Sequence, residues 1–427
     1  MSTDTTLESR LEWFQDLKFG VMMSLSPRCL LGMSPWVLSL DHARDPAQSA
    51  RVRPNWDYDI DVFRNTYWNQ YKVFYPRHFD PEEWAGVAKD AGARYFVFQN
   101  KHHDGFCAWD TQLTDYKITS RDCPYSDHPN PDVTARLFDA FRKRDFGIGV
   151  YFSYSDWHSP FYWKPYTPCP DRHLNYDTNQ EPERWQRFAD FVHGQIRELM
   201  SGYGRVDILW LDGGWDIHAG KKDIQLGRMV EMARGYQPGL IVVDRNGRGP
   251  YENYQTPENR IPAEPLGVPW ETCMSMGGKP IQELIRILVE IVSKGGNLLL
   301  MGMSGTPDGT LAPPVVENLT QMGEWLAVNG EAIYGTRMHS QYKEGDVHYT
   351  RKENTVYAIQ LAGSGAGLPR QVTVQHVQPA RGSAVRLLGV EEPLEWQAAA
   401  DGVTVSVPES VVQSPPCRHA YSFRFEV

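Results

Sequence analysis

The stretch VFQNKHHDGFCAWD at residues 97–110 ends an apolar run in a dense group of ionisable side chains, namely Lys101, His102, His103 and Asp104. Burying such groups costs free energy unless each has a partner, so the cluster indicates a binding site. Imidazoles hydrogen-bond hydroxyl groups, and they are also the commonest metal ligands. Adjacent residues rarely aim both rings at one ion, and no H-E-x-x-H spacing occurs. We therefore predict no metal site.

Further polar clusters follow other apolar runs of strand length. The run at 148–152 ends in SYSDWHSP, the run at 206–211 ends in DGGWD, which begins with Asp212, and the run at 240–243 ends in DRNG, which contains Arg245. A lone Asp before two glycines is more often a turn former than a functional group. Several such clusters at strand ends, however, favour one shared pocket over independent turns.

The elements that would position these clusters alternate between strands and helices. Apolar runs at 19–23, 95–98, 148–152, 206–211, 240–243 and 298–303 read as strands buried on both faces. Helical stretches with acidic or proline starts lie between them, as in DPEEWAGVAKDAG from residue 80. The alternation predicts a parallel sheet, and the number of units favours a (β/α)8 TIM-like barrel over residues 1–337. No G-x-G-x-x-G follows the first strand, which disfavours a dinucleotide-binding fold.

The C-terminal part has a different pattern. Short alternating segments such as RQVTVQHV, GVTVSVP and AYSFRFEV are separated by Gly, Pro and charged turns. This pattern is typical of antiparallel sheets, so we predict a β-sandwich over residues 338–427.

Bulk composition narrows the classes of partner. The 427-residue chain has a formal net charge of −10, which argues against nucleic acid and anionic membranes as partners. The six Cys residues form no C-x-x-C pair and read as reduced thiols. The N-terminus carries acids and no apolar signal-peptide core, so we expect a cytoplasmic protein. We expect no cofactor, and a homo-oligomer is compatible with the sequence. Long polar loops at 41–64 and 155–181 are expected to be functional or mobile.

In a barrel enzyme the carboxyl ends of the strands form the active-site face, where the polar clusters would converge. Candidate walls of the pocket are aromatic and His side chains near strand ends, with simple core packing as the competing interpretation: Trp109, Tyr154, Trp157, His158 and Trp215. Arg245 is a candidate contact for a ligand hydroxyl.

The sequence resembles the α-L-fucosidases of glycoside hydrolase family 29. The matching stretches include WFQDLKFGV, FDPEEWAGVAKDAGARYFVFQNKHHDGFCAWDT, YFSYSDWHSP, VDILWLDGG, PENRIP and GGNLLLMGMSGTPDG, and KHHDGF is the most specific of them. The resemblance covers most of the chain. It implies a retaining exo-glycosidase without cofactors, acting on a fucoside-bearing oligosaccharide or glycoconjugate through a covalent glycosyl-enzyme intermediate.

Retaining glycosidases use two carboxyl groups, a nucleophile and an acid/base. The resemblance implies Asp212 as the nucleophile and Glu258, in TPENRIP, as the acid/base, while Glu271 in PWETC is its rival. Whichever residue is the acid/base needs a raised pKa to stay protonated near neutral pH. His102 and His103 match the family's paired histidines, one of which would contact sugar hydroxyls.

One departure from the family pattern puts the sugar in question. The family's first strand carries a sugar-binding His where this chain has Ser24, and the shorter hydroxyl cannot reach what an imidazole reaches. Sites built on hydrogen bonds to hydroxyls lose much affinity when one partner is absent. A glycosidase with specificity shifted away from fucose, for example toward an L-galactose-like sugar, is therefore an alternative. An inactive carbohydrate-binding relative and a metal-dependent hydrolase on a barrel are the others.

Overall fold

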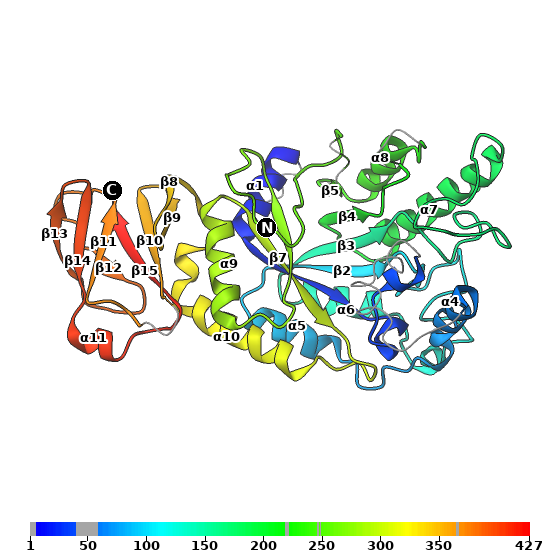
Figure 1. The fold of residues 1–427 in the computed structure, drawn as a ribbon, viewed down its shortest axis with the longest axis horizontal. Helices are drawn as coiled ribbons and strands as arrows, with labels where there is room; N and C mark the ends of the chain where they lie inside the picture. Colours follow the sequence, from blue (N-terminus) through cyan, green and yellow to red (C-terminus); the bar gives the residue numbers. More distant parts are fainter. Residues whose placement is uncertain (1–5, 40–58, 218–221, 246, 248, 364–366) are drawn as a thin grey trace.

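The computed structural model describes residues 6–39, 59–217, 222–245, 247, 249–363 and 367–427. Its larger part is built around a parallel sheet with helices outside, and its C-terminal part consists mainly of antiparallel strands (Figure 1). Of the long loop predicted at 41–64, residues 41–58 lie outside the described part of the chain. Within the described residues, no helix is long and apolar enough to cross a lipid bilayer.

The parallel sheet has the spatial order β5-β4-β3-β2-β1-β7-β6. Its strands are β1 (Phe19–Ser24), β2 (Tyr95–Lys101), β3 (Gly147–Ser153), β4 (Ile208–Asp212), β5 (Ile241–Asp244), β6 (Glu271–Ser275) and β7 (Asn297–Ser304). Successive residues alternate between two cores. Tyr151 and Trp210 belong to the core enclosed by the sheet, whereas Phe152 and Leu211 pack against the helices. This alternation decides which side chains reach the mouth of the barrel.

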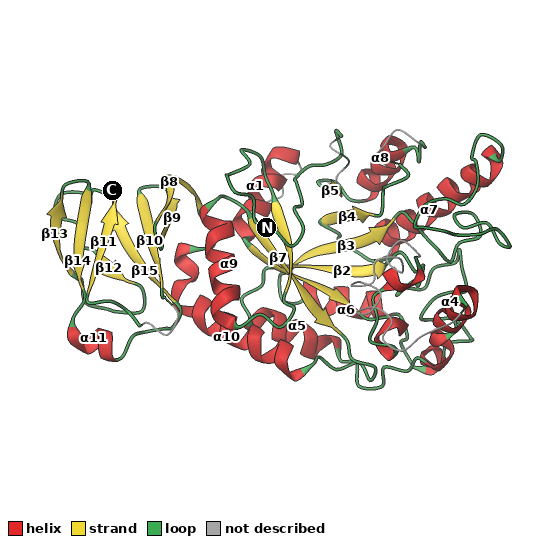
Figure 2. Cartoon of the chain, in the orientation of Figure 1, coloured by secondary structure: helices red, strands yellow, loops and turns green. Residues whose placement is uncertain are grey.

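Helices cover the outer face of the sheet (Figure 2). These are α5 (Pro81–Asp90), α6 (Val133–Arg142), α7 (Pro182–Gly202), α8 (Leu226–Tyr236), α9 (Ile281–Ser293) and α10 (Pro313–Asn329). Two helices lie elsewhere. Helix α1 (Leu7–Leu17) packs Phe14 and Leu17 into the core enclosed by the sheet, and α4 (Ile60–Trp68) lies beyond the carboxyl end of β2, where Tyr67 bonds Asp104. The acid-and-proline starts predicted from the sequence are present. Asp80 accepts hydrogen bonds from the first amides of α5, and Asp132 accepts one from the third residue of α6. Short 3₁₀ helices η1 (Pro27–Leu30) and η2 (Pro35–Leu38) follow β1.

The predicted eightfold repeat is not regular. The described residues form seven parallel strands, and no helix separates β5 from β6 within them. The segment 253–258 lies between these two strands instead: the Asn253 amide donates to the Val242 carbonyl at 2.9 Å, and the Glu271 amide donates to the Gln255 carbonyl at 2.9 Å. The architecture is TIM-like, with an irregular segment where a further strand–helix unit was expected.

The C-terminal part has two antiparallel sheets, of order β12-β15-β10-β9-β8 and β11-β14-β13. Their strands are β8 (Arg337–Glu344), β9 (Val347–Lys352), β10 (Thr355–Leu361), β11 (Gln371–Gln375), β12 (Arg386–Leu387), β13 (Glu395–Ala399), β14 (Gly402–Ser406) and β15 (Ala420–Glu426), with the short helix α11 (Glu409–Gln413) before β15. Val372 and Val403 from one sheet and Val356 and Phe423 from the other share one core. The antiparallel sandwich predicted for this region is confirmed.

Candidate active site

A cavity of about 260 Å³ lies where the carboxyl ends of β2, β3 and β4 meet. It is smaller than the roughly 300–1,000 Å³ typical of pockets for drug-sized ligands, so it suits a single monosaccharide. Six of the predicted site residues line it: His102, His103, Asp212, Trp215, Arg245 and Glu258. The inference that the polar clusters converge on one pocket therefore agrees with the geometry.

Asp212 is the last residue of β4 and lies on the inward-facing side of the strand, like Trp210. Its Oδ1 accepts hydrogen bonds from the Gly213 amide at 2.8 Å and from Arg245 Nη1 at 3.2 Å. Its Oδ2 accepts one from the Tyr151 hydroxyl at 2.7 Å. A carboxylate offers about four lone-pair sites. Oδ2, with one of these donors, is therefore the oxygen with more capacity to attack a bound ligand.

The surroundings of Asp212 favour its charged form. Burial raises the pKa of this carboxyl group, and the Arg245 charge lowers it. His103 and the hydrogen bonds from Tyr151 and Gly213 lower the pKa further, so the net pKa lies below its ordinary value. Asp212 is ionised at neutral pH, as a nucleophile must be.

Arg245 links the two carboxylates of the cavity. One terminal nitrogen of its guanidinium donates to Asp212, and the other donates to Glu258 Oε2. Asp212 is 15% exposed and Glu258 is 44% exposed, so one carboxylate lies at the floor of the cavity and the other toward solvent. The segment 253–258 carries Glu258 beside β6, where it forms a bridge with Cys273. The arrangement places two acidic groups around one sugar-sized space.

The paired histidines present complementary hydrogen-bonding atoms. The His102 Nδ1 atom accepts the His103 amide at 2.8 Å, which leaves the proton of the neutral ring on Nε2. The His103 Nδ1 atom lies 2.7 Å from the Ser153 hydroxyl, which donates to the Ser155 carbonyl. His103 therefore carries its proton on Nδ1 and has Nε2 as an acceptor. Burial lowers the pKa of His103 to about 4 and that of His102 well below its usual value, so both rings are neutral at pH 7.

Several predicted pocket walls lie elsewhere in the described structure. Trp109 is fully buried in the core between sheet and helices, where its Nε1 donates to Glu198 at 3.1 Å. The Tyr154 hydroxyl donates to Asp244 at 3.2 Å within the same core. These predictions are corrected because residues beyond the strand ends turn outward toward the helices.

Trp157 and His158 also do not line the cavity. Trp157 stands one layer behind it, with its ring 5.3 Å from that of His103 and stacked on Trp163. His158 stacks on Tyr116 with a centroid distance of 4.2 Å. The glycine at position 213 is explained by packing within the protein. A Cβ atom there would lie 2.9 Å from the Ser153 hydroxyl and 3.2 Å from the His103 ring.

Ser24 ends β1 and hydrogen-bonds the Ser304 hydroxyl at 2.8 Å. It lines a second cavity of about 560 Å³ that adjoins the first, and is absent from the lining of the smaller one. The Ser24 hydroxyl is therefore bonded within the protein and lies outside the lining of the cavity that holds Asp212.

Glu271 does not fit the role of a rival acid/base. It is the first residue of β6, at the end of the barrel opposite the cavity, and it is fully buried. The Tyr95 hydroxyl donates to it at 2.6 Å and Trp210 Nε1 donates at 3.1 Å. The sequence made Glu271 the rival acid/base, but β6 begins at this residue, so its carboxyl group lies at the end of the barrel away from the cavity.

The buried Glu271 predicts a pH-dependent stability. Burial raises its pKa from 4.5 to about 7, although the hydrogen bonds from Tyr95, Trp210 and Tyr254 oppose the shift. Because the folded state holds this proton more tightly than the unfolded state, stability falls as pH rises from about 4.5 to 7. At 1.36 kcal/mol per pKa unit, the loss is about 3 kcal/mol.

We expect Glu271→Gln to remove the pH dependence of stability that comes from this carboxyl group. The difference in free energy of unfolding between variant and wild type, measured by urea titration at several pH values, should shift in favour of the variant between pH 4.5 and 7. Glu324→Gln, at an exposed position in α10, is the matched control and should keep the wild-type slope. Parallel pH profiles for wild type and Glu271→Gln would contradict the prediction.

Several residues of the cavity were missed in the sequence. Tyr151 reads as core material within an apolar strand, yet its inward position brings its hydroxyl to Asp212. Trp36 comes from η2 and Arg172 from the loop at 155–181, and the Arg172 guanidinium lies 4.9 Å from the Trp36 ring centroid. Period-two alternation along β3 would have identified Tyr151. Nothing local in the sequence marks Trp36 or Arg172.

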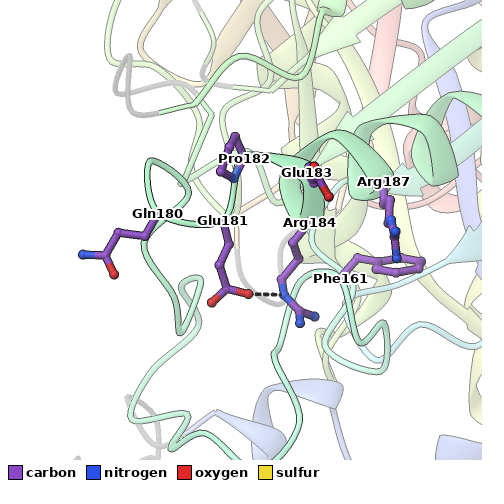
Figure 3. Close-up of a pocket in the computed structure, with 7 residues that line it drawn as sticks. All are labelled: Phe161, Gln180, Glu181, Pro182, Glu183, Arg184 and Arg187. Carbon is purple, nitrogen blue, oxygen red and sulfur yellow. Dashed lines mark hydrogen bonds and ion pairs between the residues drawn. The ribbon is translucent and has the colours of Figure 1, made fainter.

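A separate hollow of about 510 Å³ lies at the N-terminal end of α7 (Figure 3). Glu181 there accepts a hydrogen bond from Arg184 Nε at 2.8 Å. None of the predicted site residues lines this hollow.

Among the described residues, no group of three or more His, Cys, Asp or Glu side chains is arranged to hold a metal ion.

Known proteins resemble the chain over nearly its full length. The family model described as alpha-L-fucosidase matches residues 2–331, and that described as alpha-L-fucosidase C-terminal domain matches residues 341–426. The plasma alpha-L-fucosidase of Homo sapiens is 30% identical over 82% of this chain and 76% of its own.

Solved structures agree in fold. Alpha-L-fucosidase isoenzyme 1 from Paenibacillus thiaminolyticus is 28% identical with a TM-score of 0.79, covering 99% of this chain and 100% of its own. The Thermotoga maritima alpha-fucosidase in complex with fucose is 26% identical with a TM-score of 0.76, covering 99% and 100%. With a family model matching well over half of its length, the chain belongs to the alpha-L-fucosidase family, glycoside hydrolase family 29, and is a glycoside hydrolase.

Proposed function

We propose that this protein is a retaining exo-glycosidase that removes a terminal α-L-fucosyl residue, or a closely related α-L-sugar, through a covalent intermediate on Asp212. The observation that carries the proposal is the pair of carboxylates Asp212 and Glu258. Both accept hydrogen bonds from the Arg245 guanidinium, and both line a cavity sized for one sugar. The solved relative from Thermotoga maritima binds fucose, which supports this class of sugar.

In the first step, Asp212 Oδ2 attacks the anomeric carbon while Glu258 gives its proton to the departing oxygen. Glu258 must therefore enter the step protonated. Its Oε2 accepts from Arg245, so Oε1 is the oxygen available to carry the proton. Arg245 and the Tyr151 hydroxyl hold the attacking carboxylate in place, and the neutral His102 and His103 rings offer one donor and one acceptor to sugar hydroxyls.

In the second step, Glu258 takes a proton from water as the water oxygen attacks the anomeric carbon. The bond between the sugar and Asp212 breaks, and the sugar leaves with the configuration it had in the substrate. Two displacements on opposite faces of the sugar ring account for this retention.

A glycosidase acting on a sugar other than fucose is the second candidate function, and one observation favours it. Ser24 stands where the family carries a sugar-binding His, but its hydroxyl bonds Ser304 and lines the neighbouring cavity, so the imidazole contact is absent. A sugar with an additional polar group, such as an L-galactose-like sugar, would find space there.

A screen of aryl glycosides tests the proposal. We expect an α-L-fucoside or a close relative to be hydrolysed, while α- and β-D-glycosides are not. NMR during the first turnovers should show the α-anomer as the initial product. Initial release of the β-anomer would refute the covalent intermediate, and no hydrolysis of any glycoside would favour a carbohydrate-binding role.

A further inference from the structure

Two segments that are far apart in the sequence meet in one wall of the smaller cavity. Trp36 belongs to η2, and Arg172 belongs to the loop 155–181. The Arg172 guanidinium lies 4.9 Å from the Trp36 ring centroid and 5.6 Å from that of Trp215. The Trp36 ring also lies 5.1 Å from the His103 ring. The shape of this wall therefore depends on how η2 and the loop are held together.

The nucleophile is held by a different part of the protein. The hydrogen bonds to Asp212 described above come from Tyr151 in β3, from Gly213 and from Arg245, which directly follows β5. These donors lie on strands or just after their ends. A change in the loops can thus alter the wall while the attacking carboxylate keeps its place.

A buried arginine of α4 contacts both segments of the wall. Arg64 is 4% exposed, and its Nε and Nη2 atoms donate to the carbonyl of Leu38, the last residue of η2, at 3.0 and 2.9 Å. Nη2 also donates at 3.0 Å to the carbonyl of Cys169, which lies in the loop. Nη1 donates to Asp61 at 3.4 Å. One guanidinium thus joins the end of η2 to the loop.

The face of the same guanidinium packs on the layer of aromatic rings behind the wall. Arg64 lies 4.7 Å from the Trp163 ring centroid, and Trp163 stacks on Trp157 at 5.3 Å. The Trp157 ring lies 5.5 Å from Trp36, and its Nε1 donates to the Arg172 carbonyl at 3.1 Å. Arg64 is therefore connected to both wall residues through this layer as well.

The chemistry of the Arg64 side chain suits it to joining two irregular segments. Burying a cation costs free energy, and an apolar side chain of similar size would fill the space at a lower cost. A guanidinium, however, presents several N–H donors in a rigid plane and can stack on an aromatic ring at the same time. It can fix two backbone carbonyls at a set separation, which an apolar side chain cannot do.

We propose that Arg64 is a positioning residue, which holds Trp36 and Arg172 in the wall of the cavity and so sets the affinity for the terminal sugar. The inference rests on the proposed function, because that function places the terminal sugar in this cavity. Arg64 takes no part in the bond-breaking steps. Its effect appears in the binding of the sugar, since the contacts that orient Asp212 come from elsewhere.

Replacement of Arg64 by glutamine tests the proposal with the best aryl glycoside from the screen. An aromatic contact corresponds to roughly a 3- to 10-fold change in affinity, so KM should rise by about that factor. We expect kcat to change less than about 2-fold, because binding common to the ground and transition states is lost. The Kd of the released monosaccharide, measured by tryptophan fluorescence, should rise with KM. Arg64→Lys keeps the charge but not the fork, so its Kd should lie between those of wild type and Arg64→Gln.

Arg10→Gln is the matched control, since Arg10 is a buried arginine of α1 that donates to Asp207 at 2.7 Å and to the Gly239 carbonyl at 3.0 Å. It lines neither cavity. Its loss should lower the free energy of unfolding and leave KM and Kd at their wild-type values. A merely structural role of Arg64 would give this same pattern, with KM and Kd unchanged, and would overturn the proposal.

A double-mutant cycle shows whether Arg64 acts through the wall. In a Trp36→Ala background, Arg64→Gln should raise Kd by a smaller factor than in wild type, because part of the wall is already absent. Equal factors in the two backgrounds would overturn the proposal. Circular dichroism checks folding, and Arg64→Lys takes the place of Arg64→Gln in the cycle if the latter is unfolded. If wild type cleaves no glycoside, the proposed function fails, while the Kd of L-fucose still tests the role of Arg64.

Discussion

Replacement of Asp212 by alanine is expected to lower kcat for an activated aryl glycoside on the order of 10⁴- to 10⁶-fold, the scale seen when a covalent nucleophile is removed. The physical reason is that, among the described carboxylates that line the cavity, Asp212 is the one oriented by hydrogen bonds from Tyr151 and Gly213. Steady-state kinetics of purified variant and wild type measure the loss. Added azide should restore turnover by attacking the anomeric carbon directly, giving a glycosyl azide of inverted configuration.

Asp244→Asn is the matched control for this experiment. Asp244 is the last residue of the neighbouring strand β5 and is buried, but it accepts from Tyr154 and does not line the cavity. We expect it to lose far less activity than Asp212→Ala. If Asp212→Asn instead kept the turnover of wild type, the covalent mechanism would be untenable and a carbohydrate-binding role would gain support.

Substitution of Glu258 by glutamine should give the second-largest effect, and its size should depend on the leaving group. General acid catalysis contributes about 10²- to 10⁴-fold, so kcat/KM for a disaccharide should fall by that factor. A dinitrophenyl glycoside leaves without a proton, so its kcat/KM should fall less than about 10-fold, since acid catalysis is then not needed. A plot of kcat/KM against leaving-group pKa would display this difference as a steeper slope.

Glu264→Gln serves as the control for Glu258, because Glu264 is an exposed acid that follows it by six residues and bonds Tyr342. Its leaving-group dependence should match wild type. Equal losses on both substrates for Glu258→Gln would assign the acid role to another group.

The predicted residues that the structure places in the cavity are those whose position follows from local pattern. Asp212 ends an apolar run, and alternation along a strand buried on both faces carries it inward with Trp210. His102 and His103 directly follow the last residue of β2, which places them at the same end of the sheet as Asp212. Strand ends on one face of a parallel barrel meet by geometry, so their convergence needs no knowledge of distant contacts.

The incorrect predictions concern residues whose position depends on tertiary contacts. Trp109 and Tyr154 follow strand ends but turn toward α7 and β5, a choice that depends on partners such as Glu198 and Asp244. β6 was not recognised as a strand beginning at Glu271, because WETCMSM mixes polar and apolar residues without alternation. The boundary between residues 337 and 338 stays a prediction.

The irregular segment 253–258 determines where the barrel opens most easily. Adjacent parallel strands are joined by ladders, whereas β5 and β6 are joined across this segment by a few single bridges. Local opening is easiest where backbone hydrogen bonds are fewest. We therefore expect the barrel to open locally between β5 and β6. The segment that carries Glu258 then moves aside for products, while the strand that carries Asp212 stays rigid.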